Sequence, residues 1–195
     1  MNMGEKALKR LLEGNQRYVN NKPELDESAR RRIEVAPAQK PFATILSCVD
    51  ARVPPELIFD QGLGDLFVIR TAGQVLDRAV LGSLEFGVAE LQIPVLVVLG
   101  HEHCGAVKAA LDVLEQQGVA EAEIEYLVEA LTPAIEQGKR MGGDVWDQAV
   151  RAQIELLVEQ LKHSEILSTG VENGTLKIVG MLYNLETGLV DITVA

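Results

Sequence analysis

The run Val95–Gly100 is apolar at every position, and it constrains the fold more than any other stretch of the sequence. A strand without polar alternation has to be covered on both faces, which is typical of a parallel sheet. Four more strand-like runs are present: Phe42–Cys48, Leu66–Arg70, Leu176–Tyr183 and Leu189–Val194, the last as an antiparallel edge. We therefore predict an α/β fold, with a mostly parallel β-sheet and an antiparallel edge strand, flanked by helices.

Helical patterns occupy most of the chain between these strands. We predict helices over residues 7–19, 54–59, 78–91, 105–117, 121–137 and 144–167. Residues 20–40 are polar and contain the basic run Arg30–Arg32, and we predict no helix or strand there. With no linker or repeat in sight, we expect one domain over residues 1–195, made of an N-terminal helical arm (1–40) and a sheet core (41–195).

Composition excludes several classes of partner. The net charge is −11 and only 4% of residues are aromatic, whereas nucleic-acid binding favours basic grooves and aromatic stacking platforms. The same negative charge argues against an anionic membrane surface, and the apolar runs are too short to span a bilayer. The first residues lack the apolar core of a signal peptide, so we expect a cytoplasmic protein.

Chemistry-bearing side chains follow two of the predicted strands. Cys48, Asp50 and Arg52 occupy alternate positions after the first strand, so their side chains point to one side. His101 and Cys104 follow the Val95–Gly100 strand, and the carboxyl ends of strands are where α/β sheets bind ligands. Thiolate and imidazole are the ligands that zinc prefers. Taken singly, these residues would be a core thiol and a loop histidine, and a disulfide is the less favoured alternative in a reducing compartment.

These motifs also carry a family resemblance. The chain resembles the β-class carbonic anhydrases, whose Cys-x-Asp-x-Arg and His-x-x-Cys motifs are matched by residues 48–52 and 101–104. The similarity runs from about Leu11 to Val190 and includes Leu11–Asn15, Gly64–Arg70, Gly82–Phe86 and Gly180–Gly188. It implies one zinc ion per chain, an Asp50–Arg52 dyad beside it, and a homodimer or homotetramer with the active site at the dimer interface.

The resemblance implies that Cys48, His101 and Cys104 are the zinc ligands. It also points to Gln39, because plant-type members place a substrate-binding glutamine nine residues before the first cysteine. Gly105 opens a helix behind a ligand thiolate, where its backbone could donate to sulfur, and we assign it with Gln39 to substrate binding. Histidine is a residue type that can shuttle protons near neutral pH, but we expect His103 to face away from the site.

Reversible hydration of CO2 to bicarbonate is the function that this resemblance implies. Asp50 has two conceivable roles there: it accepts a hydrogen bond from the attacking hydroxide, or it occupies the fourth position on zinc. Two alternatives remain, namely hydrolysis of carbonyl sulfide or carbon disulfide at the same site, and a closed zinc protein without catalysis. Because two thiolates cancel the charge of the ion, we expect activity to rise at more alkaline pH than with three histidine ligands.

Overall fold

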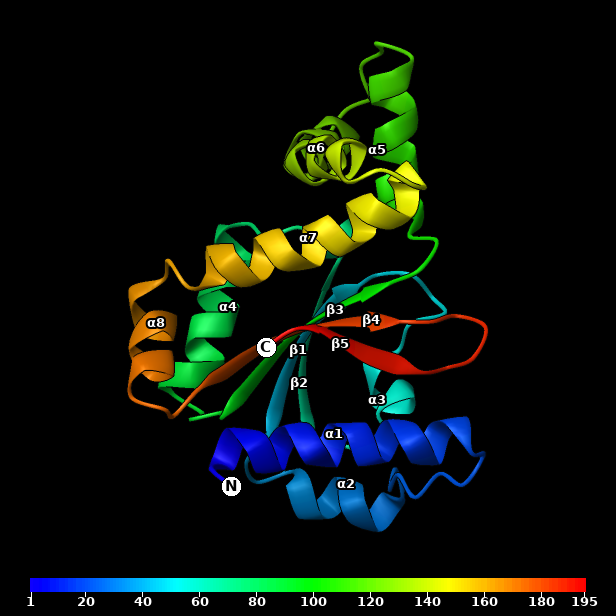
Figure 1. Cartoon of the computed structure of the whole chain (residues 1–195). Coiled ribbons are helices and arrows are strands. Elements are labelled where there is room, and N and C mark those ends of the chain that lie inside the picture. Colours follow the sequence, from blue (N-terminus) through cyan, green and yellow to red (C-terminus); the bar gives the residue numbers. More distant parts are fainter.

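A five-stranded sheet forms the centre of the computed structural model, which describes all of residues 1–195 (Figure 1). The strand order is β2-β1-β3-β4-β5. Neighbouring strands are parallel except for the antiparallel pair β4–β5. The strands are β1 (Ala43–Cys48), β2 (Leu66–Thr71), β3 (Val95–His101), β4 (Lys177–Tyr183) and β5 (Val190–Val194). This arrangement confirms the predicted fold class.

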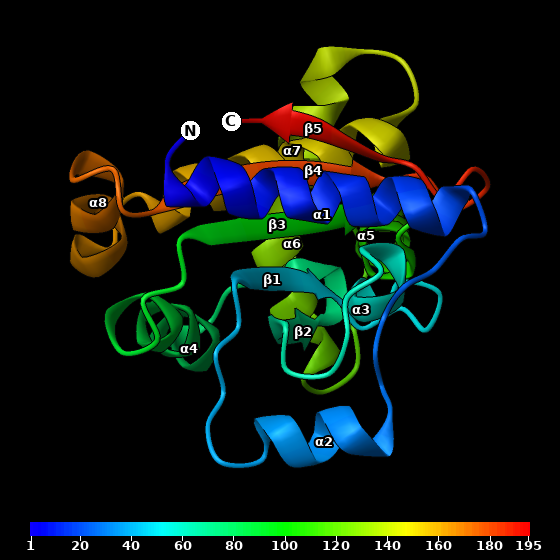
Figure 2. The same cartoon turned by 90° about the horizontal axis from the view of Figure 1, so that it is seen from below.

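Helices cover both faces of the sheet. The helices are α1 (Met3–Val19), α2 (Ala29–Val35), α3 (Pro55–Ile58), α4 (Arg78–Ala89), α5 (Gly105–Glu115), α6 (Ile124–Met141), α7 (Val145–Leu161) and α8 (Glu165–Glu172), and a 3-10 turn spans Ala72–Gln74. Helices α1 and α3 share one apolar core with one sheet face, and α4 to α8 share a second core with the other. Figure 2 shows α1 lying along β3 and β4. No helix combines the length and the apolar character that crossing a membrane requires.

Local capping explains two of the differences between the structure and the predicted helices. The first helix begins at Met3 rather than Ala7, because Asn2 and Glu5 form a capping box around its start. The predicted helix over 144–167 is two helices, α7 and α8. The Ser164 side chain accepts a hydrogen bond from the Leu167 N–H and starts α8 anew.

The polar arm also contains an element that we did not predict. Helix α2 follows Ser28, whose side chain accepts the N–H of Arg31. None of its residues is buried, and Arg31 ties it to the carbonyl of Leu63 and the carboxylate of Asp65. In Figure 2 α2 stands apart from the sheet and from α1. The helix has only seven residues and buries none of them, so the sequence contains no hydrophobic pattern that would predict it.

Helix α1 is fastened to the sheet by Gly14 and Asn15. A Cβ at Gly14 would lie 1.8 Å from the carbonyl oxygen of Phe59, so only glycine allows this approach. The buried Asn15 amide donates to the carbonyls of Ile58 and Gly188 and accepts the N–H of Val190. One side chain thus joins α1 to α3 and to the β4–β5 turn.

Candidate metal centre

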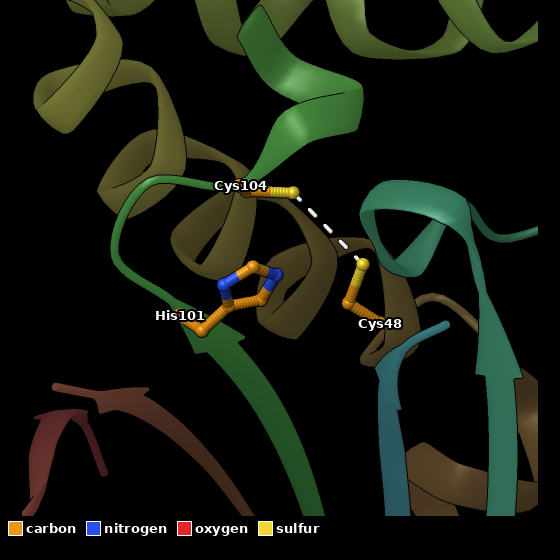
Figure 3. A group of neighbouring side chains, drawn as sticks. All are labelled: Cys48, His101 and Cys104. Atoms are coloured by element: carbon orange, nitrogen blue, oxygen red, sulfur yellow. Dashed lines mark hydrogen bonds between the residues drawn. The ribbon is translucent and has the colours of Figure 1, made fainter. Parts of the chain in front are cut away.

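Two neighbouring parallel strands end at the same edge of the sheet and bring the predicted ligands together. Cys48 is the last residue of β1, His101 is the last residue of β3, and Cys104 immediately precedes α5. Figure 3 shows the three side chains pointing toward one another. Their ligand atoms lie within 4.8 Å of one another, and all three residues are buried. The group could therefore hold a metal ion.

The imidazole of His101 is oriented for ligation. Its Nδ1 lies 2.8 Å from the carbonyl oxygen of Glu102, and because a carbonyl only accepts, Nδ1 carries the proton. Nε2 then presents a lone pair, yet it is buried and has no hydrogen-bond partner. A bound cation satisfies such an atom, and a backbone acceptor on the opposite nitrogen is the usual arrangement around a metal-bound histidine.

The two cysteines are free thiols whose sulfurs lie 4.0 Å apart, far beyond a disulfide bond of about 2.05 Å. A hydrogen bond from Cys104 is the main cause that lowers the pKa of Cys48, and burial opposes it. The same contact, together with burial, raises the pKa of Cys104. The pair therefore loses one proton readily and keeps the other, and a metal ion bound by both sulfurs would displace this remaining proton.

The start of α5 also acts on Cys104. The backbone N–H groups of Ala106 and Val107 lower the pKa of this thiol, opposing the larger effects of Cys48 and burial. These are the second and third helical residues, which are the ones that a residue at the N-cap position reaches. The backbone of Gly105, the first helical residue, which we predict in this place, is not among the groups that lower this pKa.

A carboxylate held by a guanidinium lies beside the three ligands. Arg52 Nε and Nη2 donate to the two oxygens of Asp50 at 3.0 and 2.8 Å, and the Arg52 N–H adds a bond of 2.9 Å. These hydrogen bonds lower the pKa of Asp50 to about 2, so the group is ionised at neutral pH. Asp50 Oδ2 lies 3.9 Å from His101 Nε2, which places the negative charge next to the ligand group.

Arg70 ends the Gly64–Arg70 stretch of the family resemblance, and it supports the candidate site through contacts that sequence analysis did not predict. From β2 its Nε donates to the carbonyl of Cys48 at 2.8 Å and its Nη2 to the carbonyl of Asp50 at 2.6 Å. The guanidinium therefore ties the residues of the Cys-x-Asp-x-Arg segment to the neighbouring strand. Its position in a predicted strand gave no sign of this, because the contact depends on strand pairing.

An apolar pocket of about 320 Å³ adjoins the ligand group. It contains Cys48 and Asp50 and is otherwise formed by small and aliphatic residues: Val49, Ala72, Gly105, Ala106, Ala109, Ala110, Ile124, Leu127 and Val128. Val49 and Ile124 are each 54% exposed, so the pocket opens to the surface. Gly105 is thus brought to the site. Gln39 is exposed and is not among the residues that line this pocket.

The last of the candidate groups, His103, is exposed, in agreement with our prediction that it faces away. Its ring lies edge-on to Trp146 with the ring centroids 5.2 Å apart. Trp146 belongs to α7, some forty residues along the chain, and its indole N–H donates to the carbonyl oxygen of Cys104 at 2.9 Å. No motif pointed to this contact.

Comparison with known proteins agrees with this geometry. The family model described as carbonic anhydrase matches residues 43–190. The carbonic anhydrase of Mycolicibacterium smegmatis is 42% identical over 188 residues, which cover 95% of this chain and 91% of the relative. Carbonic anhydrase 2 of Mycobacterium tuberculosis is 42% identical over 184 residues, with coverages of 93% and 89%.

Solved structures give the same result. The Coccomyxa β-carbonic anhydrase, solved in complex with acetazolamide, is similar to this chain with a TM-score of 0.75 and 27% identity. The match covers 95% of this chain and 85% of that structure. The matched region thus includes the sheet, its flanking helices and the edge that carries the ligand group.

Proposed function

The chain belongs to the β-class carbonic anhydrase family, and on that premise we propose that it hydrates CO2 with one Zn2+ held by Cys48, His101 and Cys104. The single observation that carries the proposal is the buried, unpartnered Nε2 of His101 aimed at two thiols. Since the relatives are carbonic anhydrases, hydrolysis of carbonyl sulfide or carbon disulfide is not favoured.

The donor set fits zinc in particular. Two sulfurs each about 2.3 Å from one tetrahedral zinc ion lie about 3.8 Å apart, close to the 4.0 Å between Cys48 Sγ and Cys104 Sγ. Two thiolates and one imidazole leave one coordination position free, as in catalytic sites. When bound, zinc lowers the pKa of water and so supplies a nucleophile near neutral pH.

Asp50 and Arg52 have the positions needed to orient the attacking water. The carboxylate is ionised, and Arg52 holds both of its oxygens. We propose that Asp50 accepts a hydrogen bond from the water and so directs a lone pair at CO2. The other conceivable role, in which Asp50 itself fills the fourth metal position, requires the carboxylate to give up this two-point contact. The apolar pocket suits an uncharged, small substrate.

The pH dependence of the reaction tests this account. Two thiolates cancel the charge of the dication, so water is acidified less than by a three-histidine site, where its pKa is about 7. Asp50 loses its charge only as the pH falls toward about 2, so its protonation does not change the pH–rate profile above pH 5. We expect kcat/KM for CO2 hydration to rise through pH 7 to 9. A profile that is flat from pH 6 upward would contradict this expectation.

We further propose that the chain works as a homodimer, or a dimer of dimers, with the pocket at the interface. The edge strand β2 is only partly buried along its whole length, and Phe67 on it lies beside Phe86 of α4, which is 46% exposed. Exposed apolar strand edges are usually covered in native proteins. Gln39 lies on the exposed arm, where it could serve the pocket of the partner subunit. Cytoplasmic location remains a prediction.

Sizing in solution checks the assembly. We expect a particle of at least twice the 21.2 kDa chain mass, and we expect Phe86→Glu to shift it toward the monomer, because the new charge would have to be buried. Turnover of CO2 by Phe86→Glu should fall at least about 10-fold as the variant shifts toward the monomer. Met141→Glu, on the exposed end of α6, is the matched control and should change neither property. An active monomer of wild-type sequence would refute the proposal.

A further inference from the structure

One helix contacts both ends of the loop that carries two of the proposed ligands. This loop is defined as residues 101–104, from His101 at the end of β3 to Cys104 before α5, and it follows Gly100. A Cβ at Gly100 would lie 2.6 Å from Cδ1 of Ile154, so this side chain of α7 packs directly on the strand backbone. At the other end Trp146, also on α7, donates its indole N–H to the Cys104 carbonyl oxygen at 2.9 Å. Eight residues of helix, about 12 Å, span the two contacts.

The position of Trp146 is itself well fixed. Asp144 caps the start of α7 by accepting the N–H of Asp147 at 2.9 Å, and this sets the first turn that carries the indole. The ring is partly buried and packs against the core formed by helices α4 to α8. The donor that reaches the loop therefore belongs to a partly buried ring on the capped first turn of α7.

The loop needs such external support. His103 has a φ of +52°, a conformation that residues other than glycine seldom adopt without support from the surrounding structure. The Cys104 carbonyl accepts two hydrogen bonds, from Trp146 and from the Lys108 N–H, and the second of these opens α5. The indole thus holds the peptide group that joins Cys104 to α5. The first N–H groups of this helix act on the Cys104 sulfur.

We propose that Trp146 is a positioning residue for the metal centre, which fixes the Cys104 thiol relative to Cys48 and His101. It touches neither substrate nor the ligand atoms and acts through the Cys104 backbone. The proposal rests on the proposed zinc function, because positioning matters only if the group holds a metal. If Trp146 only fills space in the core, a ring of similar shape without the N–H should serve as well.

The test compares the wild-type chain with Trp146→Phe, which keeps an aromatic ring but removes the donor. Loss of an outer hydrogen bond to a metal ligand typically lowers metal affinity 10- to 100-fold, so we expect zinc release to a chelator about 10-fold faster. Hydrogen exchange of the metal-free chains is a second readout. The amides of Glu102 and Lys108, which bond to Tyr183 and Cys104, should exchange about fivefold faster in the variant.

Val158→Ala is the matched control, because Val158 is buried in the same helix, twelve residues beyond Trp146. We expect it to lower the melting temperature and leave zinc release unchanged. Equal release and exchange in Trp146→Phe and wild type would overturn the inference, as would an equal acceleration in Val158→Ala. A wild-type chain that takes up no zinc would instead overturn the proposed function, while faster exchange in the variant would still support the role of Trp146 in holding the loop.

Discussion

Asp50→Ala is expected to retain zinc but to lose at least about 100-fold in kcat/KM for CO2 hydration. Positioned acid–base groups typically contribute 10²- to 10⁴-fold, and Asp50 is the only ionised carboxylate within 4 Å of His101 Nε2. Zinc should remain because Asp50 is not one of the three ligands. Metal analysis and initial rates on the same preparation measure both quantities.

Two further variants make this result specific. Asp50→Asn preserves shape and can still accept a hydrogen bond, but it loses the charge that pairs with Arg52, so we expect an intermediate rate. Asp191→Ala removes an exposed carboxylate on β5 and should behave as wild type. Full activity of Asp50→Ala, with an unchanged pH profile, would exclude Asp50 from the mechanism.

Cys104→Ala should weaken zinc binding at least about 100-fold and reduce hydration to background. Apparent binding energies of roughly 10–16 kcal/mol for four-ligand zinc sites correspond to about 2.5–4 kcal/mol per ligand. The thiol is 1% exposed, so water cannot easily take its place without rearrangement of the site. Equilibrium dialysis against a zinc buffer measures the affinity directly.

The control for this variant is the metal-free wild-type chain, since the sequence contains no third cysteine to replace. Adding zinc should raise the melting temperature of the wild type, because a ligand that binds the folded state stabilises the protein. The melting temperature of Cys104→Ala should stay almost unchanged, because the variant binds zinc weakly. The two thiols should react with a thiol reagent faster in the metal-free wild type than in the zinc-loaded form. Equal zinc affinity of variant and wild type would show that Cys104 is not a ligand.

The sheet and the candidate ligands could be predicted from the sequence, because both are local patterns. Uniformly apolar runs such as Val95–Gly100 specify buried parallel strands, and every predicted strand is present within about one residue. Cys48 and His101 end two of these strands, and parallel pairing of β1 with β3 brings them to one edge. The convergence of these two candidate ligands therefore follows from the polarity of β1 and β3 together with their pairing.

The supporting residues could not be predicted, because their contacts join elements far apart in the chain. Arg70 reaches the Cys48 and Asp50 carbonyls only because β2 pairs with β1, and Trp146 reaches Cys104 only because α7 crosses the end of β3. Helix α2 lacks a buried face and so lacks a hydrophobic pattern. The break before α8 was visible as Ser164, a strong N-cap residue inside an otherwise continuous helical pattern.

Zinc content and CO2 hydration, measured on one preparation as metal is removed and restored, test the central proposal most directly. The three-ligand site predicts one zinc per chain, activity that falls in proportion as a chelator removes the metal, and recovery when zinc is returned under reducing conditions. A chain that hydrates CO2 at full rate without metal, or takes up no zinc with both thiols reduced, would contradict it.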